Sequence, residues 1–330
     1  MVGRLDMDSV RRVPGHLSSF ARYLAHREHR EREDEAALSE LARPGVPLPG
    51  GVGLRWLGVA GYRLSYEGQA LYIDPYVSRV PLRSVLSGRP ALADPALHDR
   101  LFGSDPDQAV GILVGHTHFD HAIDVPLLAR RWQAPAYGSS SLRKLMAVHG
   151  LSEWAVEVAP RQEYEIGPFE VTFFPSLHSK LLLGFGVPFD GEVSCEHLDG
   201  LAPRAYKCGE IYGIRIRVGG MTFYHQGSAN LIEDQVPRGG VDVFLAGIAG
   251  RSFTPDYWSR ILPRLEPRTV VASHFDDFFR PADAPLGFST NVNLAALPEE
   301  IEAVSRDFTV RAMKPDLVEG SPAGSDEIEG

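Results

Sequence analysis

The chain has 330 residues, of which 44% are hydrophobic and 23% charged, and its formal net charge is −10. This composition supplies enough apolar side chains for a large core, and no apolar run approaches the roughly 18 residues of a membrane-spanning helix. The acidic balance argues against a nucleic-acid partner, because phosphate groups favour a basic surface on the protein that binds them.

Residues 1–50 are predicted to form a helical extension. A helix is expected over 17–41, where the charges of Arg30–Glu35 mix in sign as on a solvated face. We expect its leucines and Phe20 to pack on the rest of the chain, and contact with a second subunit in a homo-oligomer is the alternative. Residues 1–17 lack the apolar core of a signal peptide, so a cytoplasmic protein with two reduced cysteines is expected.

The main domain is placed at 51–310 and is expected to begin with a hairpin. Strands are predicted near 52–58, 61–66 and 69–73, and the last one runs into Ile73-Asp74-Pro75. On its residues alone, the aspartate of this segment is a turn residue before proline.

A cluster of potential metal ligands follows the next predicted strand, 109–114. The residues His116-Thr117-His118-Phe119-Asp120-His121 lie between this buried strand and a helix predicted over 123–132. A strand-to-helix loop can direct the first two histidines to one ion, and the aspartate and the third histidine to a second. Imidazole and carboxylate together suit Zn²⁺ and also bind Mn²⁺ or Fe. The motif therefore predicts a centre for two metal ions.

Two later histidines also follow predicted strands. His178 comes after a strand over 169–175, and His274 comes after one over 269–273. Either histidine in isolation would more often be a hydrogen-bonded residue than a ligand. Further strands are expected near 154–158, 211–218, 221–226 and 241–246, and further helices near 139–149, 255–264 and 294–306.

A long insertion over 180–208 follows the first of these histidines. It carries Leu182, Phe185 and Phe189, and this apolar content fits either a wall of the substrate cleft or a loop packed on the sheet. The insertion also contains two cysteines and a histidine near one another. Without a Cys-x-x-Cys spacing, we expect ordinary thiols rather than an extra metal site from Cys195, His197 and Cys208.

The end of the chain, 311–330, is acidic and is predicted to be a disordered tail. The candidate ligands extend from residue 116 to residue 274 and must converge in space. The region between them is therefore predicted to be one large domain rather than two.

The HTHFDH run resembles the HxHxDH signature of the metallo-β-lactamase superfamily, and the resemblance covers about residues 52–285. It implies an α/β fold built as a four-layer αββα sandwich. It also implies that His178 is the third ligand of the first ion and that His274 closes the site of the second. The segment Trp56–Ser78 is similar to the branch that contains ascorbate-6-phosphate lactonase-like proteins and N-acyl-phosphatidylethanolamine phospholipase D, which implies that Asp74 orients a ligating imidazole.

The chain departs from the superfamily pattern within Thr222–Asn230. Most hydrolases of the superfamily carry a bridging Asp there, whereas this chain places Ser228 at that position. Some members with serine keep both ligand trios, so the loss is compatible with catalysis. Asp120 is then the sole anionic ligand, and the site should favour anionic or strongly polarised substrates and hold its second ion less firmly.

His225 lies on the strand just before this serine. It could donate a proton to a leaving group, or it could be a satisfied histidine that points away from the site. We favour the second role, because alternation along the strand sets it opposite to Gln226 and Ser228.

These observations predict a metal-dependent hydrolase that acts on a small molecule. A metal-bound hydroxide would attack a phosphodiester or a lactone-type ester, and Asp120 would accept or relay its proton. The alternative is a metal-containing effector or ligand-binding protein with vestigial catalysis, which the missing bridge favours. A β-lactamase is disfavoured by the absence of a secretion signal, and a redox role with iron has no dedicated motif.

Overall fold

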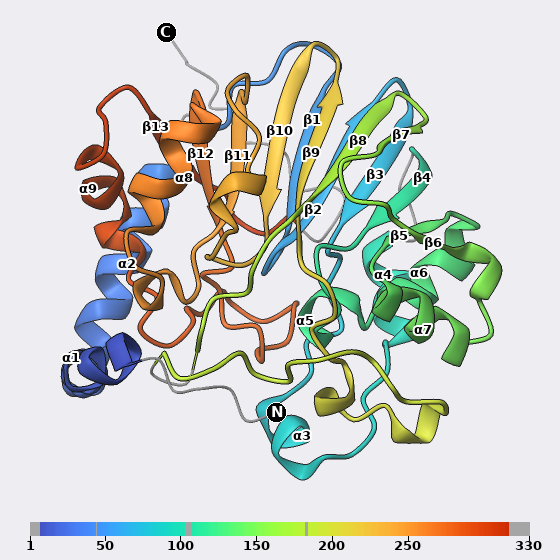
Figure 1. Cartoon of the computed structure of the whole chain (residues 1–330), viewed down its shortest axis with the longest axis horizontal. Helices are drawn as coiled ribbons and strands as arrows, with labels where there is room; N and C mark the ends of the chain where they lie inside the picture. The colour runs from blue at the N-terminus through green and yellow to red at the C-terminus, as the bar shows by residue number, and fades with distance from the viewer. Residues whose placement is uncertain (1–6, 44, 103–106, 182–183, 317–330) are drawn as a thin grey trace, which may run out of the picture.

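The computed structural model describes residues 7–43, 45–102, 107–181 and 184–316. Two β-sheets pack face to face, and helices cover the outer face of each sheet (Figure 1). This arrangement is the four-layer αββα sandwich, so the predicted fold class is confirmed. None of the helices in the described ranges is long and apolar enough to cross a membrane.

The first sheet has six strands in chain order and the second has seven in reverse order. The first consists of β1 (Gly53–Gly58), β2 (Gly61–Tyr66), β3 (Gln69–Ile73), β4 (Gln108–Leu113), β5 (Ala136–Gly138) and β6 (Ala155–Glu157). The second consists of β13 (Thr309–Ala312), β12 (Thr269–Ser273), β11 (Val243–Gly247), β10 (Met221–Gln226), β9 (Tyr212–Val218), β8 (Phe169–Pro175) and β7 (Glu163–Ile166). Strands β3 to β6 are parallel to one another, as are β10 to β13, and the remaining pairs are antiparallel.

The main core lies between the two sheets and beneath the helices of the second. Trp56, Phe173 and Phe223 are completely buried there. Helices α8 (Tyr257–Leu265) and α9 (Leu297–Glu302) bury their apolar faces in the same cluster. A second cluster lies on the outer face of the first sheet, under α4 (Pro95–Phe102), α6 (Val125–Trp132) and α7 (Ser140–Val148).

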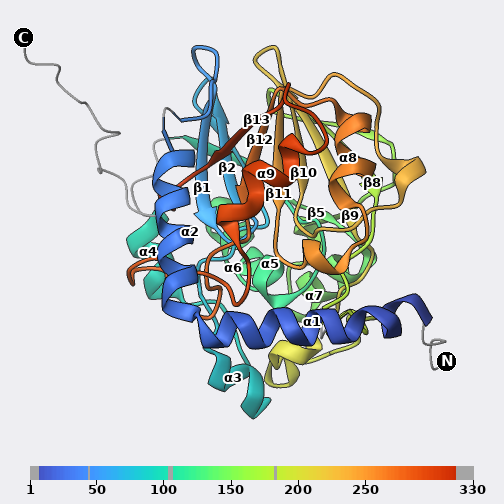
Figure 2. The ribbon, with the colours of Figure 1, turned by 90° about the vertical axis from the view of Figure 1, so that its left-hand side faces the viewer.

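The N-terminal region differs from the prediction of one helix over 17–41. Two helices, α1 (Met7–Ala25) and α2 (Arg27–Leu41), meet at His26, whose φ of −125° and ψ of 25° lie outside the helical range. Helix α2 runs along the sandwich, whereas α1 turns across its lower end (Figure 2). Leu38 packs into the core, as expected, but Leu17, Phe20 and Leu24 of α1 are exposed, so the expectation that these three pack on the domain is wrong.

Several elements were not predicted because they are short or lack a clear pattern. They are β5, β7, β13, α4, α3 (Leu82–Ser87) and α5 (Phe119–Ala122). The predicted helix over 294–306 is a 3₁₀ turn followed by the shorter α9. The domain boundary at 310 is also wrong, because Arg311 and Ala312 pair with β12. Residues 317–330 of the predicted tail lie outside the described residues.

Candidate metal centre

The candidate ligands lie on loops that follow strand carboxyl ends. His116 and His118 follow β4, His178 follows β8, and His274 follows β12. These loops meet at the lower end of the sandwich, near the short helix α5 (Phe119–Ala122) (Figure 1). Carboxyl ends of strands are the usual place for a site in α/β folds, because connecting loops there are free to carry functional side chains.

One trio consists of His116, His118 and His178, whose ligand atoms lie within 4.8 Å of one another. Nε2 of His116 is 3.1 Å from Nδ1 of His118. Nδ1 of His178 lies 2.8 Å from the carbonyl oxygen of Ser179, which can only accept a hydrogen bond. The proton of this ring is therefore on Nδ1, and its Nε2 keeps a lone pair for a metal.

The second trio consists of Asp120, His121 and His274, which are all buried and also lie within 4.8 Å of one another. Oδ2 of Asp120 is 3.3 Å from Nε2 of His274 and 3.8 Å from Nε2 of His121. The two trios are neighbours, since the His116 and His121 ring centres are 3.8 Å apart. The structure thus brings together all six residues that the sequence proposed as ligands.

Asp74 lies behind the second trio and is completely buried. Its Oδ2 is 2.9 Å from Nδ1 of His121, and its Oδ1 accepts a hydrogen bond of 2.7 Å from the amide of Gly115. A carboxylate at this place sets the ring orientation of His121 and leaves its Nε2 directed to the site. This geometry supports the orienting role that the resemblance implied for Asp74.

His225 is a satisfied histidine, as predicted, but its partner is the same carboxylate, so it points toward the group behind the second trio rather than away from the site. Its Nε2 is 2.9 Å from Oδ2 of Asp74. Alternation correctly set His225 opposite to Gln226, but the face of His225 is the one between the sheets, where Asp74 lies. Alternation does not reach Ser228, because β10 ends at Gln226.

The hydroxyl of Ser228 interacts with the residue that follows His178. It accepts a hydrogen bond of 3.0 Å from the amide of Ser179 and lies 3.3 Å from the Ser179 hydroxyl. The adjacent Gly227 is close to the second trio, since a Cβ there would lie 3.1 Å from Cε1 of His121 and 2.9 Å from Oδ2 of Asp74. This segment carries no carboxylate toward the site.

Burial and charge give the two trios different electrostatic character. Burial lowers the pKa of His118 to about 4 and that of His178 to about 3, and it holds the pKa of His116 well below its usual range. Burial would also lower the pKa of His121, but the charges of Asp74 and Asp120 outweigh it and raise that pKa. The first trio is therefore neutral at pH 7 and presents free lone pairs.

The carboxyl of Asp120 is ionised despite its burial. Burial alone would raise its pKa, but the charge of His121 and the contact with His274 hold the pKa well below its usual range. Asp120 is the one anionic side chain in the two trios. Three neutral nitrogens beside a mixed carboxylate and imidazole set fit divalent transition metals.

His274 is positioned by a network that the sequence did not reveal. Its backbone has a φ of 57°, and its amide donates a hydrogen bond of 2.7 Å to the carbonyl of Val59 in the β1–β2 turn. The Val59 amide donates to Oδ1 of Asp276 at 2.8 Å, and Oδ2 of Asp276 pairs with Arg79 at 2.8 Å. Glycine suits position 58, because its φ is 89° and a Cβ would also lie 1.9 Å from the Arg79 guanidinium.

The insertion borders the first trio. The Phe189 ring centre is 6.4 Å from that of His118, and the amide of Thr117 donates to the carbonyl of Cys208 at 2.9 Å. Leu201 and Tyr206 are completely buried, so the second half of the insertion is packed on the domain. Leu182 lies outside the described residues. The expectation of a packed loop is confirmed for this stretch, whereas a role of Phe189 in the wall of a substrate cleft stays a prediction.

The cysteines of the insertion do not join a metal site in the described part of the chain. The groups there that could hold an ion are the two trios, and Cys195, His197 and Cys208 form no third one. The thiol of Cys195 donates to the carbonyl of His197, and Cys208 is buried.

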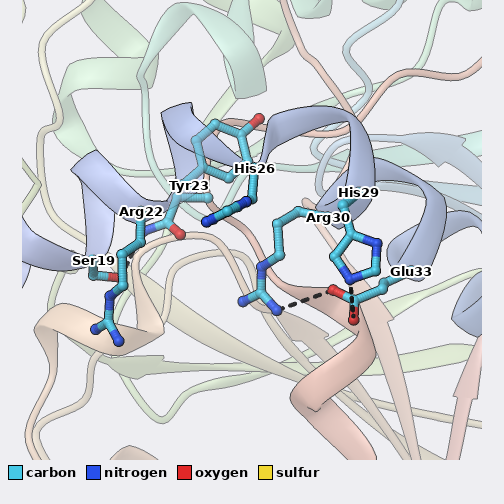
Figure 3. A pocket seen from close by; sticks show the side chains of 8 residues that line it. Ser19, Arg22, Tyr23, His26, His29, Arg30 and Glu33 are labelled. Atoms are coloured by element: carbon cyan, nitrogen blue, oxygen red, sulfur yellow. Dashed lines mark hydrogen bonds and ion pairs between the residues drawn. The ribbon is translucent and has the colours of Figure 1, made fainter.

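A separate hollow of about 360 Å³ lies at the elbow between α1 and α2 (Figure 3). Glu33 pairs with two other side chains that line this hollow, Arg30 at 3.2 Å and His29 at 3.4 Å. The lining residues are Ser19, Arg22, Tyr23, His26, His29, Arg30, Glu33 and Asn291. No candidate metal ligand lines this hollow, so it is distinct from the metal centre.

Comparison with known proteins agrees with this arrangement. Residues 53–274 match the family model described as the beta-lactamase superfamily domain. The chain belongs to the metallo-β-lactamase superfamily. It is 30% identical to the UPF0173 metal-dependent hydrolase of Ruegeria sp. (strain TM1040), over 68% of this chain and 86% of that protein. It is 29% identical to the UPF0173 metal-dependent hydrolase of Anaeromyxobacter sp. (strain K), over 79% of this chain and 83% of that protein.

The chain is therefore a metal-dependent hydrolase of the UPF0173 family within this superfamily. Among solved structures, it is similar to Igni18, a metallo hydrolase from Ignicoccus hospitalis, with a TM-score of 0.50 and 17% identity over 80% of this chain and 95% of that one. It is also similar to CmlA, a diiron β-hydroxylase from Streptomyces venezuelae, with a TM-score of 0.52 and 16% identity over 82% of this chain and 54% of that one. These two enzymes differ in chemistry, so the likeness shows the shared fold.

Proposed function

We propose that this metallo-β-lactamase superfamily hydrolase uses two divalent ions, with Zn²⁺ as the first candidate, to cleave a phosphodiester or a lactone-type ester. The main support for this function is that the two ligand trios lie next to each other. His116, His118 and His178 would hold one ion, and Asp120, His121 and His274 would hold the other. The similarity of Trp56–Ser78 to lactonase-like and phospholipase-D-like proteins supports these substrate classes.

When bound, the ions would acidify a water molecule and polarise the substrate oxygen. The chain contributes the groups that hold and move protons around this reaction. Oδ2 of Asp120 faces the two histidines of its trio, so Oδ1 is the atom that would accept the proton of the attacking water. Oδ2 of Asp74 lies 2.9 Å from Nδ1 of His121, so it would favour the proton on that nitrogen and leave the Nε2 lone pair for the ion.

The charge of the centre supports a preference for anionic or strongly polarised substrates. Asp120 is the one carboxylate among the six proposed ligands, and the Ser228 hydroxyl is neutral. The ions would therefore keep more of their positive charge than they would with a bridging aspartate. A phosphodiester satisfies this preference through its charge, and a lactone satisfies it through its polarised carbonyl.

The proposal is tested by metal analysis of the purified protein and a screen against bis(p-nitrophenyl) phosphate, a set of lactones and nitrocefin. We expect turnover of the phosphodiester or a lactone, loss of turnover on chelation, and recovery with Zn²⁺ or Mn²⁺. His178→Ala should lose metal and activity, because two ligands remain for the first ion. His197→Ala removes an exposed histidine of the insertion and should change neither.

Three results would contradict the proposal. Full metal content in His178→Ala would mean that this histidine is not a ligand. Turnover of nitrocefin alone would point to β-lactam hydrolysis. A fully metal-loaded protein that is inactive on every member of the panel would instead favour the effector alternative, in which the centre serves ligand binding.

A further inference from the structure

Large hydrophobic side chains that are exposed gather at one end of the molecule. Among the side chains that the structure describes, they include Leu17, Phe20 and Leu24 of α1, Leu82 and Leu86 of α3, and Phe185 of the insertion. The others lie just after α3 and within or beside the insertion. Helices α1 and α3 and the insertion all lie at the lower end of the sandwich, where the metal ligands are (Figures 1 and 2). Single exposed apolar residues are ordinary, but a concentration of them marks an interaction surface.

Helix α1 presents a continuous apolar stripe to the outside. Leu17, Phe20 and Leu24 follow the i, i+3, i+7 spacing of one helix face, and their exposed fractions are 49%, 38% and 56%. A different face holds the helix on the domain: Tyr23 is buried, and the His16 ring is 4.8 Å from that of Phe253. The stripe is therefore not used for packing within the chain.

The same helices are basic in an acidic protein. Helix α1 contains three arginines and one aspartate, and residues 81–93 contain two arginines and no acidic residue, whereas the whole chain has a net charge of −10. An isologous contact through this surface would set the arginines of one copy near those of another, which is unfavourable. Apolar side chains with arginines suit an anionic lipid surface, which receives the apolar stripe and attracts the positive charge.

We propose that α1 and α3 dock this protein on the surface of an anionic lipid bilayer, with α1 lying in the plane of the interface. The metal-ligand end of the sandwich then faces the membrane. Docking requires no turnover, so this proposal does not rest on the proposed function and can be tested with or without metal.

The test is flotation of the full chain with vesicles of phosphatidylcholine, with and without phosphatidylglycerol. We expect binding to the anionic vesicles, much less binding to the neutral ones, and weakening near 1 M salt, where the Debye length falls to about 3 Å. The triple variant Leu17→Ser, Phe20→Ser and Leu24→Ser should bind about tenfold more weakly or worse, since each serine removes apolar area from the interface. Circular dichroism establishes that α1 stays helical in the variant.

Charge variants separate the basic contribution from a general effect of net charge. Arg83→Gln with Arg89→Gln should weaken binding about 25-fold at low salt, at roughly fivefold for each charge near the surface. Arg268→Gln with Arg306→Gln is the matched control, since these exposed arginines lie at the opposite end, before β12 and β13, and should leave binding unchanged.

Three outcomes would overturn the proposal. The first is equal flotation of the wild type and the triple serine variant. The second is absence of binding to anionic vesicles. The third is a dimer of the wild type in solution that the triple variant converts to a monomer without any vesicle binding, which would assign the surface to a second copy of the chain.

Discussion

Replacing Asp74 by Asn should weaken the second metal site more than it disturbs the fold. Oδ2 of Asp74 lies 2.9 Å from both Nδ1 of His121 and Nε2 of His225, and Oδ1 accepts from the Gly115 amide. Asn suits the backbone, because Asp74 has a φ of 42° and Asn tolerates this left-handed region. The substitution therefore removes the charge and turns one acceptor oxygen into an NH₂ donor, while it keeps the shape.

The magnitude follows from the contacts that remain. The Asn carbonyl can still accept from Gly115, but its NH₂ group faces two ring nitrogens and cannot accept from either. His225 can adapt by changing its tautomer. His121 is left without an acceptor, which costs about 2 kcal/mol of folding stability. That loss lowers the melting temperature by about 3 °C for a domain of this size. Without this support for His121, the affinity for the second ion should fall by about 10- to 100-fold, as is typical when the group that orients a ligand is lost.

The assay is titration of metal-free protein with Zn²⁺, which resolves two binding steps, together with thermal melting of the metal-free form. Asp242→Asn is the matched control, because Asp242 also accepts from a backbone amide, that of Thr222 at 2.9 Å, far from the ligands. The control should melt lower but bind both ions normally. Wild-type affinity for the second ion in Asp74→Asn would refute the reasoning that Asp74 orients His121.

Three further predictions concern pH, the missing carboxylate and the insertion. The folded pKa values of about 4 for His118 and about 3 for His178 lie below the unfolded value of 6.5, so metal-free protein should lose stability as the pH falls below 6.5. At pH 5 the loss should be about 4 kcal/mol for the two histidines together. The raised pKa of His121 offsets part of this loss. Urea unfolding between pH 7 and 5 measures this, and a flat profile would contradict it. Ser228→Asp should raise the metal content toward two ions per chain and move the pH of half-maximal activity upward. Ser228→Asn is the control and should change neither quantity. If Ser228→Asp changes neither quantity, residue 228 does not face both ions. Phe189→Ala should raise KM for a bulky ester by about tenfold, because the lost apolar contact contributes roughly 1.4 kcal/mol to binding. KM for a small ester should be unchanged. Phe185→Ala, at an exposed position, serves as its control, and equal effects on both esters would mean that Phe189 is merely structural.

Local patterns in the sequence were sufficient for most of the fold and for the ligands. The motif His116–His121 places four candidate ligands within six residues, so their proximity follows from chain connectivity. His178 and His274 could be proposed because each follows a predicted strand and because the family resemblance supplies their order. Strands with a clear apolar run, such as β12 (Thr269–Ser273), were predictable, whereas β5 (Ala136–Gly138) carries no such run and was missed.

The roles of the surrounding residues depended on contacts that no local pattern encodes. His225 and Asp74 are 151 positions apart and meet because β10 and β3 belong to opposing sheets whose inner faces are in contact. Alternation showed that His225 and Gln226 face opposite sides, but only the packing of the two sheets decided which side is the site. The orientation of α1 has the same origin, because its amphipathic pattern predicts a face to be covered but not what covers it.

Short segments of the chain were enough to indicate the superfamily, the placement of the ligands on loops after strands and the absence of a carboxylate at residue 228. Tertiary structure decided that Asp74 serves both His121 and His225, and that Arg79 and Asp276 hold the turn that positions His274. The Arg79 and Asp276 partners are 197 positions apart, and both are almost fully buried. Such pairs form only when the two sheets have packed, since buried charges are stable only where the fold supplies their partners.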